Sequence, residues 1–296
     1  MAGIWYGLAA YSLWGFFTLY WSLLPNVRAL EVVCHRIVWA FVLLAAIGAR
    51  SWRRRGVSVS PRVVGLYGVA ALLIGVNWFL YVYAVNAGLV VESSLGYFIT
   101  PLVNVLLGVA VFRERLRPLQ WAAVLLALAG VVRLTTAYGA VPWIALCLAC
   151  SFGSYGLVKK KAPLSSLDGL TLETAVLVLP AALYLAVVQS TGTGAFLVSG
   201  AFTSLLLVGA GVITVGPLLL FATAVRRVPL SVIGILQYIS PTIQFLLGVF
   251  VFREPFTSAQ LSGFILVWVG LVVFGIDGAL ARKTTRDLAV LDILEK

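Results

Sequence analysis

Charged side chains are scarce in this sequence of 296 residues. Only 10% of the residues are Asp, Glu, Lys or Arg, and 62% are hydrophobic, whereas an ordinary soluble domain carries about 25% charged residues. A water-soluble chain of this length cannot cover its surface with so few polar groups. The shortage of charge excludes a soluble globular domain. It predicts an integral membrane protein, with room for roughly ten spans of ~20 apolar residues.

Cysteine and histidine are also rare, with three cysteines and one histidine, His35. Three cysteines cannot form a disulfide framework, and the pair Cys147 and Cys150 lacks the second Cys or His pair of a zinc site. We interpret these two cysteines as small packing residues of a membrane helix. The sequence also lacks a complete phosphate-binding loop and a G-x-S-x-G elbow. It therefore predicts no enzyme, no metal site and no bound cofactor.

The net charge of +11 is carried by Lys and Arg in short loops between apolar runs. This is the positive-inside pattern of membrane proteins rather than a nucleic-acid-binding surface. If the N-terminus lies in the cytoplasm, 17 of the 21 Lys and Arg residues fall in cytoplasmic segments and three in outside loops, and the remaining one, Arg36, lies within a span. The distribution predicts a multi-pass protein with an even number of spans and both termini in the cytoplasm.

Apolar runs predict an all-α integral membrane protein with ten transmembrane helices, and breakers such as Pro25 and Pro163 fall between the runs. The expected spans are 3–24, 30–49, 63–86, 91–112, 119–137, 141–158, 172–189, 199–223, 231–252 and 259–277. The last residues, 278–296, mix charges with leucines. We expect them to form a cytoplasmic tail, either as a short helix on the membrane surface or as a disordered segment.

One internal repeat stands out, at an offset of 140 residues. Residues 99–114 read ITPLVNVLLGVAVFRE and residues 239–254 read ISPTIQFLLGVFVFRE. The shared Pro, Gly and Arg-Glu predict a duplication, with a first five-helix repeat at 1–137 and a second at 138–277. Because five is an odd number, equivalent helices cross the membrane in opposite directions, so the repeats have inverted topology. Such a pair is typical of transporters that alternate between outward-open and inward-open states.

Each copy of the repeat places a proline near the middle of a span, with polar side chains along the same helix face. The proline removes one backbone hydrogen bond and frees the carbonyl four residues earlier. We interpret this stripe as the lining of a substrate pathway, because kinked backbone is tolerated at membrane depth where it faces a cavity. The alternative is a pair of structural kinks joined by helix–helix hydrogen bonds. The residues concerned are Tyr97, Pro101, Asn104, Gln237, Pro241 and Gln244.

Three further residues are candidates for the substrate pathway. Asn77 and Tyr81 share a face of the third span, and substrate binding and hydrogen bonds to neighbouring helices explain them equally well. Trp14 lies in the middle of the first span. Its ring either packs among helices or stacks on a ligand.

Acidic residues and the single histidine, in or beside spans, are candidates for proton coupling. Glu31 and His35 lie four residues apart on one helix face, and an ordinary histidine titrates near neutral pH. The alternative is an ion-paired cluster near the outer mouth that fixes helix packing. Glu92 and Glu173 fall at predicted span N-termini, where a carboxylate interacts favourably with the helix dipole. Glu92 is also a candidate proton carrier.

Several runs resemble the EamA branch of the drug/metabolite transporter superfamily, and within it the RarD group, over about residues 3–277. They are ALEVVCHRIVW at 29–39, NWFLYVYAVN at 77–86, ESSLGYFITPLVNVLLGV at 92–109, GLTLET at 169–174 and LQYISPTIQFLLGVF at 236–250. The resemblance implies a ten-helix protein of the bacterial inner membrane with a central cavity between its halves. It also implies similarity to exporters of amino acids and other small metabolites, and it supplies no catalytic residues.

The sequence as a whole predicts a secondary transporter that exports small metabolites or drugs by alternating access. No ATP-binding motif is present, so the energy is expected from an ion or substrate gradient. The expected partners are a small-molecule substrate, the lipid bilayer and, under the proton hypothesis, protons. The alternative is a channel-like or regulatory membrane protein that does not cycle between states.

Overall fold

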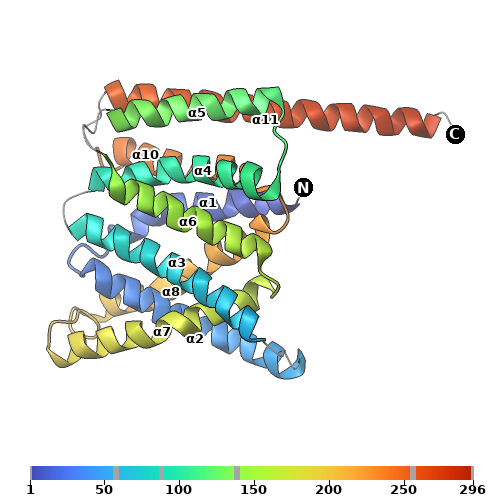
Figure 1. The fold of residues 1–296 in the computed structure, drawn as a ribbon. Helices are drawn as coiled ribbons and strands as arrows, with labels where there is room; N and C mark the ends of the chain where they lie inside the picture. Colours follow the sequence, from blue (N-terminus) through green and yellow to red (C-terminus); the bar gives the residue numbers. More distant parts are fainter. Residues whose placement is uncertain (1, 56–59, 87–89, 137–140, 254–257, 295–296) are drawn as a thin grey trace.

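The computed structural model describes residues 2–294 except 56–59, 87–89, 137–140 and 254–257. The described residues form eleven α-helices and no strand, so the predicted all-α class is confirmed (Figure 1). The helices are α1 (Ala2–Trp21), α2 (Ala29–Arg55), α3 (Pro61–Asn86), α4 (Val90–Phe112), α5 (Pro118–Thr136), α6 (Trp143–Lys161), α7 (Ser166–Ser190), α8 (Ala201–Val225), α9 (Leu230–Gln237), α10 (Ile239–Phe250) and α11 (Ser258–Leu294).

The ten predicted spans are present, because α9 and α10 together make the ninth. Within the described chain, eight stretches are long and apolar enough to cross a membrane, including the combined stretch Leu230–Leu247. The helices α1 and α6 are not among these eight stretches, although they have 20 and 19 residues. Trp, Tyr and Gly residues in α1 and three lysines at the end of α6 lower the mean hydropathy of these helices. The protein is therefore a multi-pass, all-helical membrane protein.

The ninth span is interrupted at Tyr238, between α9 and α10. Pro241 lacks the N–H group that would bond to the carbonyl of Gln237. The chain tightens just before the proline, where the Tyr238 N–H donates to the Ile235 carbonyl oxygen at 3.2 Å. The equivalent proline of the first half, Pro101, lies inside α4 without dividing it. Only the second of the two predicted proline sites therefore breaks its helix.

Helix packing follows the symmetry of an inverted repeat. Helices at equivalent places in the two halves pack on each other, namely α2 on α7, α4 on α9 and α5 on α11. The contact of α1 with α8 is matched by the equivalent contact of α6 with α3. Figure 1 shows that α1 begins and α11 ends at the same end of the bundle, as an even number of spans requires. The ten transmembrane helices are thus two inverted five-helix repeats.

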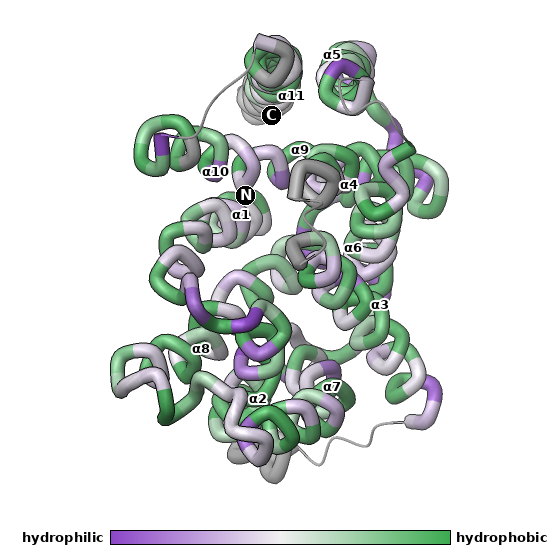
Figure 2. Tube along the Cα trace, turned by 90° about the vertical axis from the view of Figure 1, so that its left-hand side faces the viewer, coloured by the Kyte–Doolittle hydropathy of each residue, from purple (hydrophilic) through white to green (hydrophobic). Residues whose placement is uncertain are grey.

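The helices α5 and α11 form a pair at one edge of the bundle, as the end-on view in Figure 2 shows. Small residues let their backbones approach closely. A Cβ atom on Gly130 would lie 2.7 Å from the Gly263 carbonyl oxygen, and one on Gly270 would lie 2.8 Å from that of Ala123. A larger residue at either glycine would force the two helices apart.

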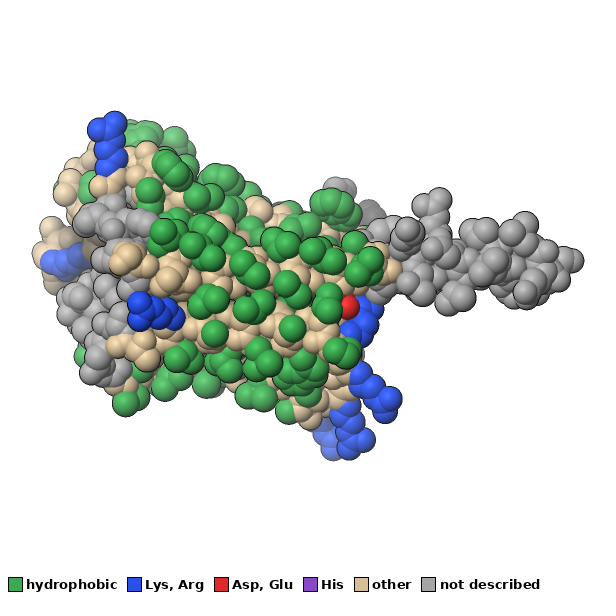
Figure 3. All heavy atoms as spheres, turned by 90° about the horizontal axis from the view of Figure 1, so that it is seen from above, with side chains coloured by type: hydrophobic (Ala, Val, Ile, Leu, Met, Phe, Trp, Pro, Cys, Tyr) green, Lys and Arg blue, Asp and Glu red, His purple; other side chains and the backbone are tan. Residues whose placement is uncertain are grey.

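Apolar side chains cover the middle of the bundle on the face shown in Figure 3, and Lys and Arg lie toward its ends. Large apolar residues such as Leu72, Leu106 and Leu179 are between 62% and 66% exposed. This surface is unfavourable in water, whereas the hydrocarbon core of a bilayer solvates it. The outer face of the bundle is therefore a lipid-facing surface.

The C-terminal residues continue α11 without a break to Leu294, and the helix projects beyond the bundle (Figure 1). The two predicted alternatives for residues 278–296 are a short helix on the membrane surface and a disordered segment. The described part, 278–294, is helical and continuous with the tenth span, and its place on the membrane surface stays a prediction. No Pro or Gly follows Gly278, and helix-favouring Ala, Leu and Arg are frequent there, so the helix of the tenth span propagates.

The helix α7 begins earlier than predicted, at Ser166, where the Asp168 N–H donates to the Ser165 hydroxyl oxygen at 3.1 Å. Glu173 therefore lies inside the helix, and the prediction that it caps the N-terminus is wrong. Its carboxylate instead accepts hydrogen bonds from Lys159 Nζ at 2.6 Å and from the Tyr155 hydroxyl at 3.0 Å. The buried Lys159–Glu173 ion pair ties α6 to α7.

Replacement of Lys159 by Met should destabilise the protein strongly. The change leaves the Glu173 carboxylate buried without its cation, which costs about 3–5 kcal/mol. We expect the thermal unfolding midpoint in detergent to fall by roughly 5 °C or more, and the double variant Lys159→Met, Glu173→Leu to recover most of the loss. The control Lys161→Met changes an exposed lysine of the same helix turn and should leave the midpoint nearly unchanged. Equal midpoints for the two single variants would contradict this assignment.

Candidate functional site

The Arg36 guanidinium lies among aromatic rings from several helices. We call this group the arginine cluster, and it consists of Trp21 of α1, Arg36 of α2, Trp78 and Tyr81 of α3, Tyr97 of α4 and Thr214 of α8. Because the neighbours of Arg36 come from four other helices, its guanidinium points into the bundle and not toward lipid.

Three side chains hold the Arg36 guanidinium in position. Nε donates a hydrogen bond to the Thr214 hydroxyl oxygen at 3.0 Å. The guanidinium carbon lies 4.8 Å from the ring centroid of Trp78 and 5.1 Å from that of Trp21. Both distances are within the range of cation–π attraction. The cation is therefore held between indole rings of α1 and α3.

Two tyrosines complete the arginine cluster. The rings of Tyr81 and Tyr97 meet edge to face with their centroids 6.1 Å apart, and both hydroxyls are close enough to interact electrostatically with Arg36. The Tyr97 side chain is 37% exposed. The Tyr97 ring therefore contacts Tyr81 and keeps part of its surface accessible. The structure thus brings the predicted pathway residues Tyr81 and Tyr97 to one place.

The charge of Arg36 is only partly compensated. A cation inside a membrane span costs several kcal/mol unless it is paired or faces a polar cavity. In the described part of the chain the ion pairs join other residues, and no carboxylate lies within 4.0 Å of Arg36. Two cation–π contacts contribute about 0.5–2 kcal/mol each. The remaining cost marks Arg36 as a functional candidate rather than a packing residue.

A second polar contact joins the two halves where α4 crosses α9. The Asn104 side-chain amide donates to the Gln237 carbonyl oxygen at 2.9 Å, and the two side chains are 0% and 5% exposed. The helices meet closely because Gly234 has no side chain, and a Cβ there would lie 2.5 Å from the Pro101 carbonyl oxygen. Asn104 and Gln237, predicted separately from the repeat, are therefore direct partners.

The repeat offset of 140 residues pairs Phe98 with Tyr238, and these two residues touch. The Tyr238 hydroxyl donates to the Phe98 carbonyl oxygen at 3.2 Å, and the ring centroids are 6.5 Å apart. Since each residue is the counterpart of the other, the pseudo-two-fold axis passes close to this contact.

The same offset pairs Tyr97 with Gln237 and Asn104 with Gln244. The bonded pair Asn104–Gln237 therefore has an equivalent pair, Gln244 with Tyr97. This equivalent pair is not bonded in the described chain, because Gln244 Nε2 donates at 3.5 Å to the Trp14 carbonyl oxygen and Tyr97 lies against Tyr81. Among the described residues, one of two equivalent polar pairs is hydrogen-bonded and the other is not.

Glu114, in the connection between α4 and α5, caps the start of α9. We call this end of the bundle, where α1 begins and α4 ends, the terminal end. The Glu114 carboxylate accepts hydrogen bonds from the Leu230 N–H at 2.7 Å, the Ser231 N–H at 2.9 Å and the Ser231 hydroxyl at 2.7 Å. Lys160 Nζ lies 3.6 Å away. Glu114 belongs to the first repeat and α9 to the second. The cap therefore joins the two repeats at the terminal end.

The surroundings of Glu114 change its acidity. Burial alone would raise the pKa of this carboxyl, but the hydrogen bonds from Ser231 and Leu230 and the charge of Lys160 together lower the pKa below its usual value. The positive end of the α9 dipole acts in the same direction. Glu114 is therefore ionised at neutral pH, and its charge is part of the contact.

Glu31 and His35 lie on a different face of α2 from Arg36 and contact the connection between α7 and α8. Glu31 Oε1 accepts a hydrogen bond from the Ala195 N–H at 2.7 Å. His35 Nδ1 accepts one from Trp39 Nε1 at 3.2 Å, and its ring centroid lies 4.9 Å from that of Phe196. Both residues border a hollow of about 270 Å³.

No hydrogen bond joins Glu31 to His35 in the described residues, so a direct proton relay between them is not formed in this state. His35 Nε2 is buried and without a described partner, whereas the Glu31 carboxylate is tied to backbone. The third candidate proton carrier, Glu92, lies in α4, and its side chain falls outside the described residues.

Asn77 and Trp14 take packing positions. Asn77 Nδ2 donates to the Leu148 carbonyl oxygen at 2.9 Å and to the Ser151 hydroxyl at 3.0 Å, which ties α3 to α6. The Trp14 ring contacts Tyr11, Phe152 and Phe221 in an aromatic group between α1, α6 and α8. Their ring centroids lie 5.5, 6.0 and 5.8 Å from that of Trp14. The structure does not bring Asn77 or Trp14 into direct contact with Arg36 in the described residues.

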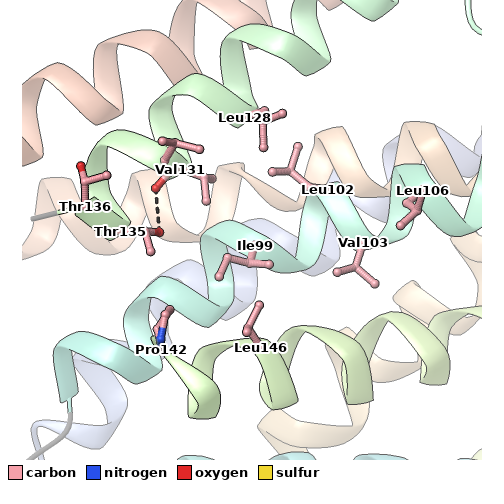
Figure 4. Close-up of a pocket in the computed structure, with 11 residues that line it drawn as sticks. Ile99, Leu102, Val103, Leu106, Leu128, Val131, Thr135, Thr136, Pro142 and Leu146 are labelled. Atoms are coloured by element: carbon pink, nitrogen blue, oxygen red, sulfur yellow. Dashed lines mark hydrogen bonds between the residues drawn. The ribbon is translucent and has the colours of Figure 1, made fainter. Parts of the chain in front are cut away.

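A larger hollow of about 410 Å³ lies between α4, α5 and α6. Its walls are apolar side chains such as Leu102, Leu128 and Leu146 (Figure 4). The Thr135 hydroxyl at its edge already donates to the Val131 carbonyl oxygen at 2.8 Å. Because the wall residue Leu106 is 64% exposed on the outer face, this hollow opens toward lipid and offers no group that would recognise a polar substrate.

The site residues predicted from the sequence did not include Arg36, Trp21, Trp78, Thr214 or Glu114. Arg36 lies well inside a predicted span, whereas Arg133 lies near the end of one, and this position was itself a signal, because cations at membrane depth are functional by default. The others gave no signal, since threonines, tryptophans and loop glutamates are common in membrane proteins.

Comparisons with known proteins agree with this architecture. The sequence matches the EamA-like transporter family twice, over residues 1–136 and 140–276. It is 45% identical to the protein RarD of Streptomyces exfoliatus, over 96% of this chain and 91% of that protein. It is 44% identical to an uncharacterized transporter of Vibrio cholerae, over 96% and 95%. A solved crystal structure has the same fold, with a TM-score of 0.68 and 23% identity over 92% of this chain and 96% of that one.

The inverted helical repeats and their interior polar residues define the class as a membrane transporter. The chain belongs to the EamA-like transporter family, and it is a membrane transporter of the drug/metabolite superfamily. The resemblance to the EamA branch and the RarD group is therefore confirmed. Several relatives are named as transporters, which agrees with the prediction that the chain is not an enzyme.

Neutralising Glu114 should weaken its contact with the start of α9 and so lower the stability of the folded protein. It should also make this stability depend less on pH in the acidic range. A carboxyl whose pKa is lowered by folding adds stability above its unfolded-state pKa of about 4.3, and this stability is lost as the pH falls toward the folded-state pKa. We therefore expect Glu114→Gln to lower the thermal midpoint at neutral pH. The difference from the unchanged protein should shrink as the pH falls below about 4.

The control for this pH series is Arg115→Gln, an exposed residue of the same connection. It should leave the pH dependence of the midpoint as it is. A difference between Glu114→Gln and the unchanged protein that stays constant over the whole pH range would show that the carboxylate charge is not the cause.

Proposed function

We propose that the protein is a secondary transporter that exports small metabolites or drugs across the bacterial inner membrane by alternating access. Both termini lie in the cytoplasm in this proposal, as the distribution of Lys and Arg indicates. The terminal end is then the inner side. The units that change conformation are the repeats at residues 1–137 and 138–277.

The observation that carries the proposal is the asymmetry between two equivalent polar contacts. Asn104 and Gln237 are hydrogen-bonded on the inner side, whereas the described residues show no hydrogen bond between Tyr97 and Gln244 on the outer side. An exchange of conformation between the two repeats would close Tyr97 on Gln244 and separate Asn104 from Gln237. The structure then corresponds to an outward-open state, and the exchanged arrangement to an inward-open one.

The Glu114 cap supports the same assignment. Its three hydrogen bonds to α9 cross between the halves on the inner side. They must break when the inner side opens, and water then replaces the lost donors. Such an exchange of protein bonds for water bonds has a small net free energy, which suits a contact that opens and closes in every transport cycle.

Removal of the Asn104 amide should shift the protein toward the inward-open state. In a background with Cys34, Cys147 and Cys150 replaced by Ser, Tyr81→Cys places a thiol in the arginine cluster on the outer side. Loss of about 1 kcal/mol for one hydrogen bond changes a two-state population about fivefold. We therefore expect a membrane-impermeant maleimide, added from outside, to label this thiol severalfold more slowly once Asn104→Ala is added.

The matched control is Gln244→Ala, at the equivalent position of the second repeat. It removes a partner that closes the outer side in the inward-open state, so labelling of the Tyr81→Cys thiol should stay equal or rise. Equal labelling in all backgrounds, with the same thiol also reached from the inner side, would contradict alternating access. That outcome would favour the alternative of a channel-like protein that does not cycle.

Proton coupling through Glu31 and His35 stays a prediction. If these residues carry protons, efflux from vesicles should fall when the pH gradient is collapsed, and Glu31→Gln and His35→Gln should each abolish the dependence on the gradient. The test compounds are those that differ most between cells lacking and cells overproducing the protein. Equal efflux with and without the gradient would refute proton coupling and leave a facilitator.

A further inference from the structure

The Arg36 guanidinium is fixed on one side and open on the other. Nε donates to Thr214, and the rings of Trp21 and Trp78 lie against the guanidinium. Neither terminal nitrogen has a hydrogen-bond acceptor among the described residues. Neither is enclosed, because the set of buried polar atoms without a partner does not contain them. Each terminal nitrogen therefore keeps some accessible surface and has no acceptor among the described residues.

No carboxylate of the described residues neutralises this charge. Each described carboxylate has its bonds elsewhere, in the α7–α8 connection, at the ends of helices or with a lysine or arginine: Glu31, Glu114, Asp168, Glu173 and Asp277. An arginine stays protonated at all accessible pH values. Among the described residues, the arginine cluster therefore carries a positive charge that no carboxylate neutralises.

We propose that Arg36 binds the carboxylate of the transported substrate, and that this substrate is a small aromatic or conjugated monocarboxylate. The assignment rests on the proposed transport function. The two terminal nitrogens of a guanidinium form a planar fork that matches the two oxygens of a carboxylate. Thr214 and the indole rings of Trp21 and Trp78 orient the guanidinium of Arg36 without using its two terminal nitrogens, which are therefore available to a ligand.

The remainder of the arginine cluster determines the rest of the ligand. Four aromatic rings surround the cation, and ring faces and edges at this spacing accept a flat, apolar body by stacking. Among the described residues, no second Lys or Arg and no histidine contacts the arginine cluster. One positive charge matches a monoanion, whereas a phosphate dianion would need further cations.

A purely structural arginine makes a different prediction from a binding arginine. If Arg36 served only to hold helices together, its loss would destabilise the protein. If it is an incompletely paired charge kept for a ligand, a neutral side chain of similar size should be tolerated, because burying a charge opposes folding. Stability and ligand binding therefore separate the two roles.

The experiment measures the thermal unfolding midpoint of the full-length protein in detergent, with and without millimolar probes. The probes are phenylacetate, cinnamate and indole-3-acetate. Each is matched with its neutral amide, and phenyl phosphate is the dianionic comparison. We expect the carboxylates to raise the midpoint, and the amides and phenyl phosphate to raise it much less. The free protein with Arg36→Gln should have a midpoint equal to or above that of the unchanged protein.

In Arg36→Gln the carboxylate effect should disappear, with an affinity loss of roughly a hundredfold. Arg36→Lys keeps the charge but not the fork and should give an intermediate loss. Equal shifts from acids and amides, no shift from any carboxylate, or an undiminished shift in Arg36→Gln would each overturn the proposal. So would a strong loss of stability in ligand-free Arg36→Gln.

Transport measured in proteoliposomes distinguishes this inference from the proposed function. Binding of carboxylates that depends on Arg36, without any flux in proteoliposomes, would leave the binding site intact and refute transport of these compounds. Flux of a neutral metabolite that is unchanged in Arg36→Gln would support transport and refute the carboxylate assignment. Flux of a bound carboxylate that is lost in Arg36→Gln would support both.

Discussion

Lipid offers no hydrogen bonds, and this constraint governs the interior of the protein. Every buried polar side chain must find its partner within the bundle. Asn77 bonds to α6, Lys159 to Glu173 and Asn104 to Gln237, and each of these bonds joins two helices. The polar contacts therefore determine which helices pack together. Arg36 is one departure from this rule, because aromatic rings and one hydroxyl hold it while its terminal nitrogens have no acceptor among the described residues. A cost of this kind is tolerated where a ligand compensates for it.

The inverted repeat makes the structure of one half informative about the other. Phe98 and Tyr238 meet near the pseudo-two-fold axis, and the contacts on either side of it are equivalent by sequence. Equivalent contacts need not be in the same state, however, and Asn104 and Gln237 are hydrogen-bonded whereas the described residues show no hydrogen bond between Tyr97 and Gln244. If both were closed, the interior would be sealed from both sides, and if both were open, the two solutions would be joined. The difference between the halves is therefore functional information that neither half contains alone.

Some residues could be selected from the sequence, but their partners could not. The repeat singled out Asn104 and Gln237 as polar residues at membrane depth, yet nothing in a chain segment shows that residues so far apart in sequence bond to each other. Glu173 was placed at a helix start because hydropathy located the span too late, and the true cap lies at Ser165 and Asp168. Glu114 resembled any loop glutamate, because its role depends on where α9 begins, more than a hundred residues later.

By itself the sequence determined the class, the number of spans, the duplication and the inversion, because these follow from composition, hydropathy and the parity of helices, which are properties of the chain read in order. The tertiary structure alone decided which side chains meet. Arg36 was visible as a cation in a span, but its site is made by Trp21, Trp78, Tyr97 and Thr214 from four other helices. Contacts of that kind depend on how helices are rotated and tilted against one another, and the close approach of backbones at glycines sets those angles. The helices can be read from the sequence, and the site between them requires the fold.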